Sequence, residues 1–148
     1  MTVTALLCGA GERHEARVAQ EQVRFVAYDV IVDPVGRPLG AYQVDFAAAR
    51  PGDITIVGIE GGEHPAFAQP PFYDPKALMN ERAVLAAFST DAALPEGPTL
   101  VARVHVRITG DAVPDLTVAL TVAAGPGGDR FETATVTTRL AAPEGDDS

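Results

Sequence analysis

Short stretches of alternating apolar and polar residues, separated by glycine- and proline-rich turns, dominate this chain of 148 residues. The clearest stretches are residues 22–33, 39–47, 54–60, 99–109, 116–123 and 131–140. A period of two is typical of β-strands, because successive side chains of a strand point to opposite faces of the sheet. Strands at this spacing predict an all-β fold, an antiparallel β-sandwich of about eight or nine strands with immunoglobulin-like architecture.

The pattern also predicts which side chains face the core. Residues 22–33 are largely apolar on both faces, which favours an interior strand. In residues 99–109 the apolar side chains at 100, 102, 104, 106 and 108 point inward, and Arg103, His105 and Arg107 form a modest basic stripe on the outer face. Residues 116–123 and 131–140 flank a turn rich in glycine, so we predict that they pair as a hairpin.

One segment carries a helix signal. Asp74 is a suitable N-cap and Pro75 suits the first helical position. Residues 77–88 contain strong helix formers, and propensity alone favours one helix of about four turns there. The alternative is a short helix at residues 75–80 followed by a strand at residues 83–89.

Composition indicates one domain. We expect residues 1–21 to form an N-terminal strand or arm, residues 22–141 the sandwich, and residues 142–148 a flexible acidic tail. Twenty acidic residues against eleven basic ones give a net charge of −9, which opposes nucleic-acid binding and binding to anionic membranes. No apolar run approaches the roughly 20 residues of a membrane span, so we expect no membrane insertion.

The single cysteine, Cys8, allows no intrachain disulfide and no cysteine-based zinc cluster. Residues 1–10 are apolar but lack the positive charge that opens a signal peptide, so we expect a short edge strand with a buried thiol. A nucleophile–base pair of Cys8 and His14 would lie in a poorly anchored segment, and neither serine lies in a nucleophile elbow. The chain is therefore expected not to be an enzyme.

The densest polar cluster comprises Glu60, Glu63 and His64, with Asp74 ten residues further on. Carboxylate and imidazole ligands suit a cation, calcium before zinc, because the ligands are hard and lack the fixed spacing of zinc sites. The alternative is a solvated loop in which Gly61 and Gly62 supply positive φ angles. Calcium is the only cofactor that the sequence suggests.

Residues 64–74 carry Phe67, Phe72 and Tyr73 among prolines. Because prolines reduce the entropy lost when a loop becomes ordered, these aromatic side chains are candidates for stacking on a sugar or anchoring a protein partner. The alternative is that the rings fold back and close one end of the sandwich.

Residues 23–140 resemble cohesin-like domains of bacterial surface and secreted proteins. The blocks that carry the resemblance are YDVIVDP, LGAYQVDF, IVGIEGGEHPAF, PPFYDPKAL, VLAAFST and LVARVHVRI. The resemblance implies a jelly-roll-like sandwich of the cohesin and carbohydrate-binding superfamily, whose members are non-catalytic. It also implies that VLAAFST is a strand, so that at most one short helix remains near residues 75–80.

The resemblance leads to an expected function, an interaction module that docks a protein partner in an extracellular or envelope assembly. The first alternative is a carbohydrate-binding module that recognises polysaccharide through Phe72 and Tyr73. The second is a metal-dependent enzyme built on Glu60, Glu63, His64 and Asp74. The resemblance favours an extracytoplasmic location, and the absence of a signal peptide keeps a cytoplasmic one open.

Overall fold

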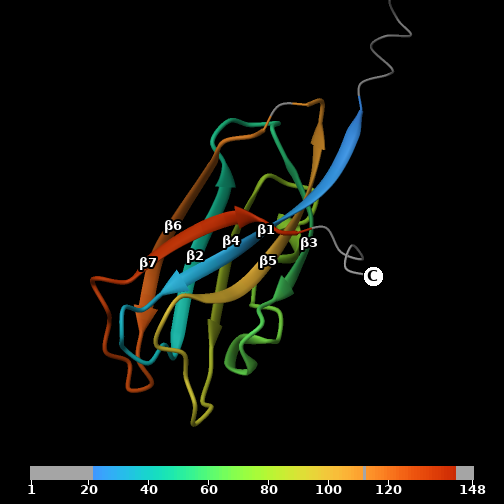
Figure 1. Cartoon of the computed structure of the whole chain (residues 1–148). Coiled ribbons are helices and arrows are strands. Elements are labelled where there is room, and N and C mark those ends of the chain that lie inside the picture. The colour runs from blue at the N-terminus through green and yellow to red at the C-terminus, as the bar shows by residue number, and fades with distance from the viewer. Residues whose placement is uncertain (1–21, 112, 143–148) are drawn as a thin grey trace, which may run out of the picture.

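The computed structural model describes residues 22–111 and 113–142. The predictions for residues 1–21, including Cys8 and His14, and for nearly all of the acidic tail lie outside the described residues. Within the described ranges the fold is all-β, with two antiparallel sheets and two single 3-10 turns in place of any α-helix (Figure 1). The predicted fold class is confirmed.

The described residues form seven strands, one or two fewer than expected from the sequence. They are β1 (Val23–Asp33), β2 (Ala41–Ala48), β3 (Thr55–Gly61), β4 (Arg82–Phe88), β5 (Thr99–Thr109), β6 (Leu116–Ala124) and β7 (Thr135–Leu140). The 3-10 turns are η1 (Pro65–Phe67) and η2 (Pro75–Ala77). None of the helical elements in the described part of the chain is long or apolar enough to cross a membrane.

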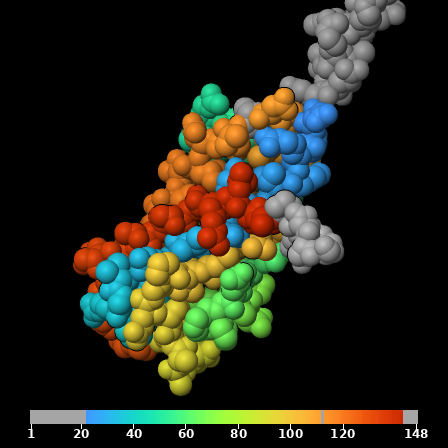
Figure 2. Space-filling view, in the orientation of Figure 1, coloured from blue at the N-terminus to red at the C-terminus, as the bar shows by residue number. Residues whose placement is uncertain are grey.

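The strands divide into a four-stranded sheet, in the order β3-β5-β1-β7, and a three-stranded sheet, in the order β4-β2-β6. Every pairing is antiparallel. In Figure 1 strands β7, β1 and β5 cross in front of β6, β2 and β4, so the two sheets form separate layers. In Figure 2 the red surface of β7 lies beside the blue surface of β1 on the front of the molecule.

The core lies between the two layers, where the inward side chains of both sheets meet. The inward positions predicted for β2 are buried in the core, as are alternate residues of β1 and the predicted inward positions of β5 except Leu100: Val30, Val32, Tyr42, Val44, Phe46, Ala102, Val104, Val106 and Ile108. Leu100 is buried but lies outside this cluster, because the register of β5 against β1 shifts beside it and Val101 is the core residue there. Strand β1 lies between β5 and β7, which confirms its prediction as an interior strand. These side chains hold the two sheets face to face and fix which residues point outward.

Tyr42 places a hydroxyl inside this core. The hydroxyl donates a hydrogen bond to the Val101 carbonyl oxygen at 3.3 Å, and burial raises the pKa of Tyr42 far above its usual value of 10.0. The folded state therefore holds this proton more tightly than the unfolded chain does. The resulting stabilisation is complete below pH 10 and is lost as pH rises above it, because the unfolded chain ionises first.

We expect the free energy of unfolding to fall above about pH 10 by up to roughly 1.4 kcal/mol per pH unit from this one group. Tyr42→Phe removes that dependence and costs about 1 kcal/mol at neutral pH through the lost hydrogen bond. Urea unfolding of both proteins at about pH 7 and pH 11 measures how much the free energy of unfolding changes with pH in each. An equal change in both proteins would contradict the assignment of this pH dependence to Tyr42.

The predicted hairpin of residues 116–123 and 131–140 forms only at its turn, where Ala124 and Arg130 make one antiparallel bridge, and is wrong for the strands beyond it. Strand β6 pairs with β2 and strand β7 pairs with β1, so the two segments belong to different sheets. The chain turns at Gly125, whose N–H donates to the Asp129 carbonyl, and then crosses between the layers at Phe131, which is buried. Because of this crossing, the Phe131 side chain packs into the core instead of lying in an exposed hairpin.

The segment around residues 75–88 follows the second of the two alternatives. Asp74 caps a single 3-10 turn, η2, by accepting a hydrogen bond from the Lys76 N–H, and strand β4 begins at Arg82. Ala83 and Leu85 point into the core and pair β4 with β2, so tertiary burial outweighs the helix propensity of this segment. The turn η1 is an additional element that the sequence analysis did not predict.

Candidate functional site

Phe72 is the candidate binding residue that the structure leaves most exposed. Its N–H donates to the Ala86 carbonyl at 2.7 Å and its carbonyl accepts from the Ala86 N–H at 3.0 Å, so Phe72 forms one bridge on the free edge of β4. Side chains directly opposite each other in an antiparallel pair share a face, and so do residues two apart in a strand. Phe72 therefore projects from the same outer face as Phe88.

The rings of Phe72 and Phe88 stack there, with centroids 6.5 Å apart and planes inclined by 14°. They remain 70% and 67% exposed. A hollow of about 210 Å³ lies beside them, lined also by Ala66, Gln69, Pro70 and Ala87. We call the two rings and this hollow the aromatic patch.

Phe67 and Tyr73, the other two aromatic candidates, fold back onto the sandwich, as the alternative in the sequence analysis proposed. Phe67 is buried and packs edge-on against Tyr42, with ring centroids 5.4 Å apart. Tyr73, on the opposite side of the chain from Phe72, is half-buried and packs against the core. Both pack against the core and anchor the backbone that presents Phe72.

The acidic cluster does not assemble as a metal site. Among the described residues no group of three or more metal-binding side chains comes together. Glu60 contacts His105 across the sheet, and Asp74 caps η2. The His64 imidazole accepts a hydrogen bond from the Ala66 N–H and so caps η1. Each of these side chains has a local partner, and no shared cation is needed to explain its position.

Gly61 and Gly62 do not have the positive φ angles expected of them. A Cβ atom on Gly62 would lie 1.9 Å from the Leu100 carbonyl oxygen, and one on Gly61 would lie 2.1 Å from the Ala68 carbonyl oxygen. The glycines are needed because the chain after β3 passes directly against β5 and the η1 loop. The interpretation of Gly61 and Gly62 as positive-φ residues of a solvated loop is therefore replaced by one of close backbone packing.

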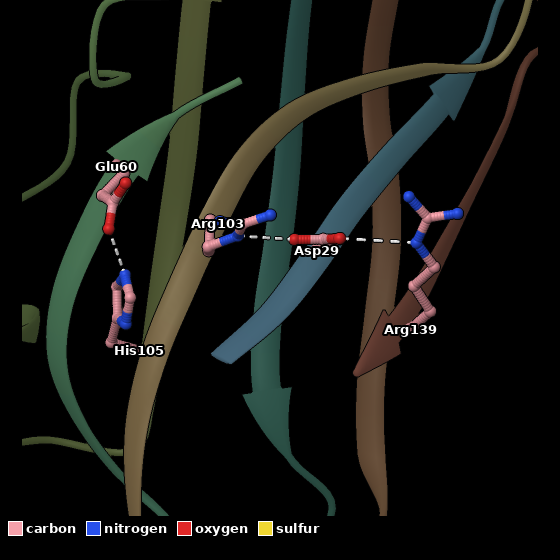
Figure 3. A network of polar contacts seen from close by, with 5 residues as sticks. All are labelled: Asp29, Glu60, Arg103, His105 and Arg139. Atoms are coloured by element: carbon pink, nitrogen blue, oxygen red, sulfur yellow. Dashed lines mark hydrogen bonds and ion pairs between the residues drawn. The ribbon is translucent and has the colours of Figure 1, made fainter. Parts of the chain in front are cut away.

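The predicted basic stripe lies on the outer face of the four-stranded sheet, but carboxylates interrupt it. Arg103 stands directly across from Asp29 of β1 and from Glu60 of β3. His105 contacts Glu60, and Arg139 of β7 completes a row of alternating charges (Figure 3). The stripe is thus mostly a charge network across four strands.

Asp29 is the centre of this network and is only 3% exposed, although it points to the outer face. One carboxylate oxygen lies 2.7 Å from Arg103 Nε, and the other lies 3.3 Å from Arg139 Nε. Both arginines are its direct cross-strand neighbours, so their side chains cover the carboxylate from either side. A buried carboxylate requires such partners, because leaving water without them costs several kcal/mol.

Sequence reasoning missed Asp29 and Phe88. The signal for Asp29 was a charge in the middle of a predicted interior strand whose two faces are largely apolar, which implies a partner of opposite charge. Phe88 is the last residue of its strand. Alternation from the buried Leu85 would place it on the outer face, but its neighbours in the sequence do not show that it stays outside the core. Its role depends on Phe72, which reaches it only through the bridge to Ala86.

The site combines an exposed aromatic surface with a network of charged side chains that are paired with one another. Among the described side chains, no nucleophile and base come together. Such a surface can bind by apolar contact and by stacking. No protein-family model, curated protein or solved structure matches this chain.

Proposed function

We propose that this protein is a cohesin-like interaction module that docks a protein partner in an extracellular or envelope assembly. The observation that carries the proposal is the stacked, exposed pair of Phe72 and Phe88. Exposed apolar surface of this kind marks interaction sites more often than a scattered apolar residue does. Aromatic side chains are also enriched at protein interfaces.

The backbone supports the same proposal. Two hydrogen bonds to Ala86 fix Phe72, and Pro70 and Pro71 restrict the chain immediately before it. Docking would therefore immobilise few side chains and cost little conformational entropy. A larger share of the free energy of apolar contact would then contribute to affinity than at a mobile loop. The buried Phe67 beneath supports the patch from the core side.

The test is affinity capture with the immobilised full chain and with the double variant Phe72→Ala/Phe88→Ala. Burying the exposed parts of both rings is worth roughly 2–4 kcal/mol, so we expect the variant to bind a retained partner about 30- to 1000-fold more weakly. Calorimetric titration of that partner measures the difference.

Val113→Ala is the matched control, because Val113 is 73% exposed and lies in the β5–β6 connection, at the end of the sandwich opposite Phe88. It should bind as the unmodified chain does. A partner bound equally by the double variant, or no retained protein at all, contradicts docking through the aromatic patch.

A second candidate function is carbohydrate binding, favoured by the near-parallel orientation of the two exposed rings. Flat apolar rings stack on sugar faces, and Phe88 takes the place that the half-buried Tyr73 was expected to fill. Native electrophoresis in soluble polysaccharides tests this function. Retardation of the unmodified chain, lost in Phe72→Ala/Phe88→Ala, would favour it over protein docking.

A further inference from the structure

Within residues 22–111 and 113–142, strand β1 has an open backbone edge at its beginning. Strand β7 pairs with β1 only from Tyr28 to Asp33, and the last hydrogen bond of the ladder runs from the Ala141 N–H to the Ala27 carbonyl at 2.8 Å. From Val23 to Val26, the described residues supply a strand partner on the β5 side alone. Figure 1 shows β1 continuing well beyond the end of β7.

The direction of the backbone groups along this edge follows from two hydrogen bonds. The Ala27 carbonyl points toward β7, and the Gln22 carbonyl points toward Gly110 beyond β5. Because the direction alternates from residue to residue, the N–H and C=O groups of Val23 and Phe25 point away from β5, toward the open side. Two residues spaced in this way match the hydrogen-bonding repeat of an added antiparallel strand.

Apolar side chains flank the edge. Phe25 is 68% exposed and Leu140 is 55% exposed, and both line a depression of about 520 Å³ that also contacts Val26, Arg103 and His105. In Figure 2 the blue surface of the start of β1 lies close to the red surface at the end of β7. An extended chain along this edge would cover both side chains and the backbone.

One positively charged side chain of β5 lies beside the edge. Arg107 lies directly across from Phe25 on β5 and forms no ion pair among the described residues. Asp29 and Glu60, two carboxylates of the same outer face, are already engaged, Asp29 by two arginines and Glu60 by His105. Arg107 thus places one positive charge beside an apolar edge, on a chain of net charge −9.

We infer that the open edge of β1 accepts an extended peptide segment of a partner protein, as an added strand with apolar and acidic side chains alternating on its outer face. Its backbone pairs with Val23 and Phe25, an apolar side chain contacts Phe25 and Leu140, and a carboxylate reaches Arg107. The site lies on the four-stranded sheet and the aromatic patch lies on the other, so this inference does not depend on the proposed function.

The probe is the blocked peptide acetyl-Thr-Val-Thr-Glu-Thr-Val-Thr-Glu-amide, with a control peptide in which lysine replaces both glutamates. Amide hydrogen exchange of the isotope-labelled full chain should slow about tenfold or more at Val23 and Phe25 when the glutamate peptide is bound. Phe25→Ala should abolish the protection, whereas Phe72→Ala should leave it unchanged, which separates this site from the aromatic patch.

Charge reversal tests the acidic preference. Arg107→Glu should weaken the glutamate peptide and strengthen the lysine peptide, each by about fivefold, and Arg107→Gln should bind both peptides alike. Thermal unfolding of each variant shows that it is folded.

Three results would overturn the inference. The first is no binding of the glutamate peptide at about 1 mM. The second is an equal change in the affinities of both peptides when Arg107 is replaced by glutamate. The third is slow exchange at Val23 and Phe25 without peptide, because the edge would then already be covered. Truncation of residues 143–148 or 1–21, or dilution of the protein, would identify whether the chain itself or a second copy covers it.

Discussion

Asp29→Asn should lower the free energy of unfolding by about 3 kcal/mol. The Asp29 carboxylate is 3% exposed and bonds Arg103 and Arg139 from opposite sides. An asparagine of the same shape leaves the two guanidinium groups facing each other across a neutral side chain. Breaking a buried pair at one partner is costly, because the Arg103 guanidinium stays where water cannot fully solvate it, whereas Arg139 is largely exposed.

Asp45→Asn is the matched control, since Asp45 bonds Arg82 at 2.6 Å on an exposed part of the other sheet. Exposed pairs contribute little, so the control should unfold at nearly the same urea concentration as the unmodified chain. Equilibrium urea unfolding measures both variants. An equal, small effect of the two substitutions would show that water reaches Asp29 freely.

Gly62→Ala should destabilise the fold by about 3 kcal/mol or more. The new Cβ would lie 1.9 Å from the Leu100 carbonyl oxygen and 2.7 Å from Val101 Cα, and both of these atoms are backbone. Since β5 is the central strand next to β3, it cannot move aside without disturbing two ladders. The Gly62 N–H bond to the Phe67 carbonyl would be lost with the displacement.

Gly97→Ala provides the comparison, because an added Cβ there meets nothing within 4 Å. That substitution should change the stability by less than about 0.5 kcal/mol. Thermal unfolding monitored by circular dichroism distinguishes the two variants. If Gly62→Ala unfolds at the temperature of Gly97→Ala, the loop after β3 packs less closely against β5 than the structure shows.

Local patterns predicted much of the sheet structure. The alternation in residues 99–109 placed Val104 and Val106 inward and Arg103 outward, and the structure has them so. The capping residue Asp74 and the following Pro75 marked a real helical turn. These predictions succeeded because a period of two and a capped turn depend on neighbours in the chain.

The same reasoning did not predict which distant segments pair with each other. The predicted hairpin failed because the turn at residues 125–129 joins strands of different sheets. Phe72 and Phe88 are sixteen positions apart and meet only through the bridge at Ala86. The sequence marks both as apolar, but their contact depends on a pairing that no local pattern predicts.

The sequence by itself determined the all-β class and most of the faces of the strands. The tertiary structure decided that Asp29 is buried between two arginines, that Gly62 is required by close packing and that two phenylalanine rings form a surface patch. The division has one physical cause. Periodicity is set by backbone geometry over a few residues, whereas burial depends on which distant strands become neighbours.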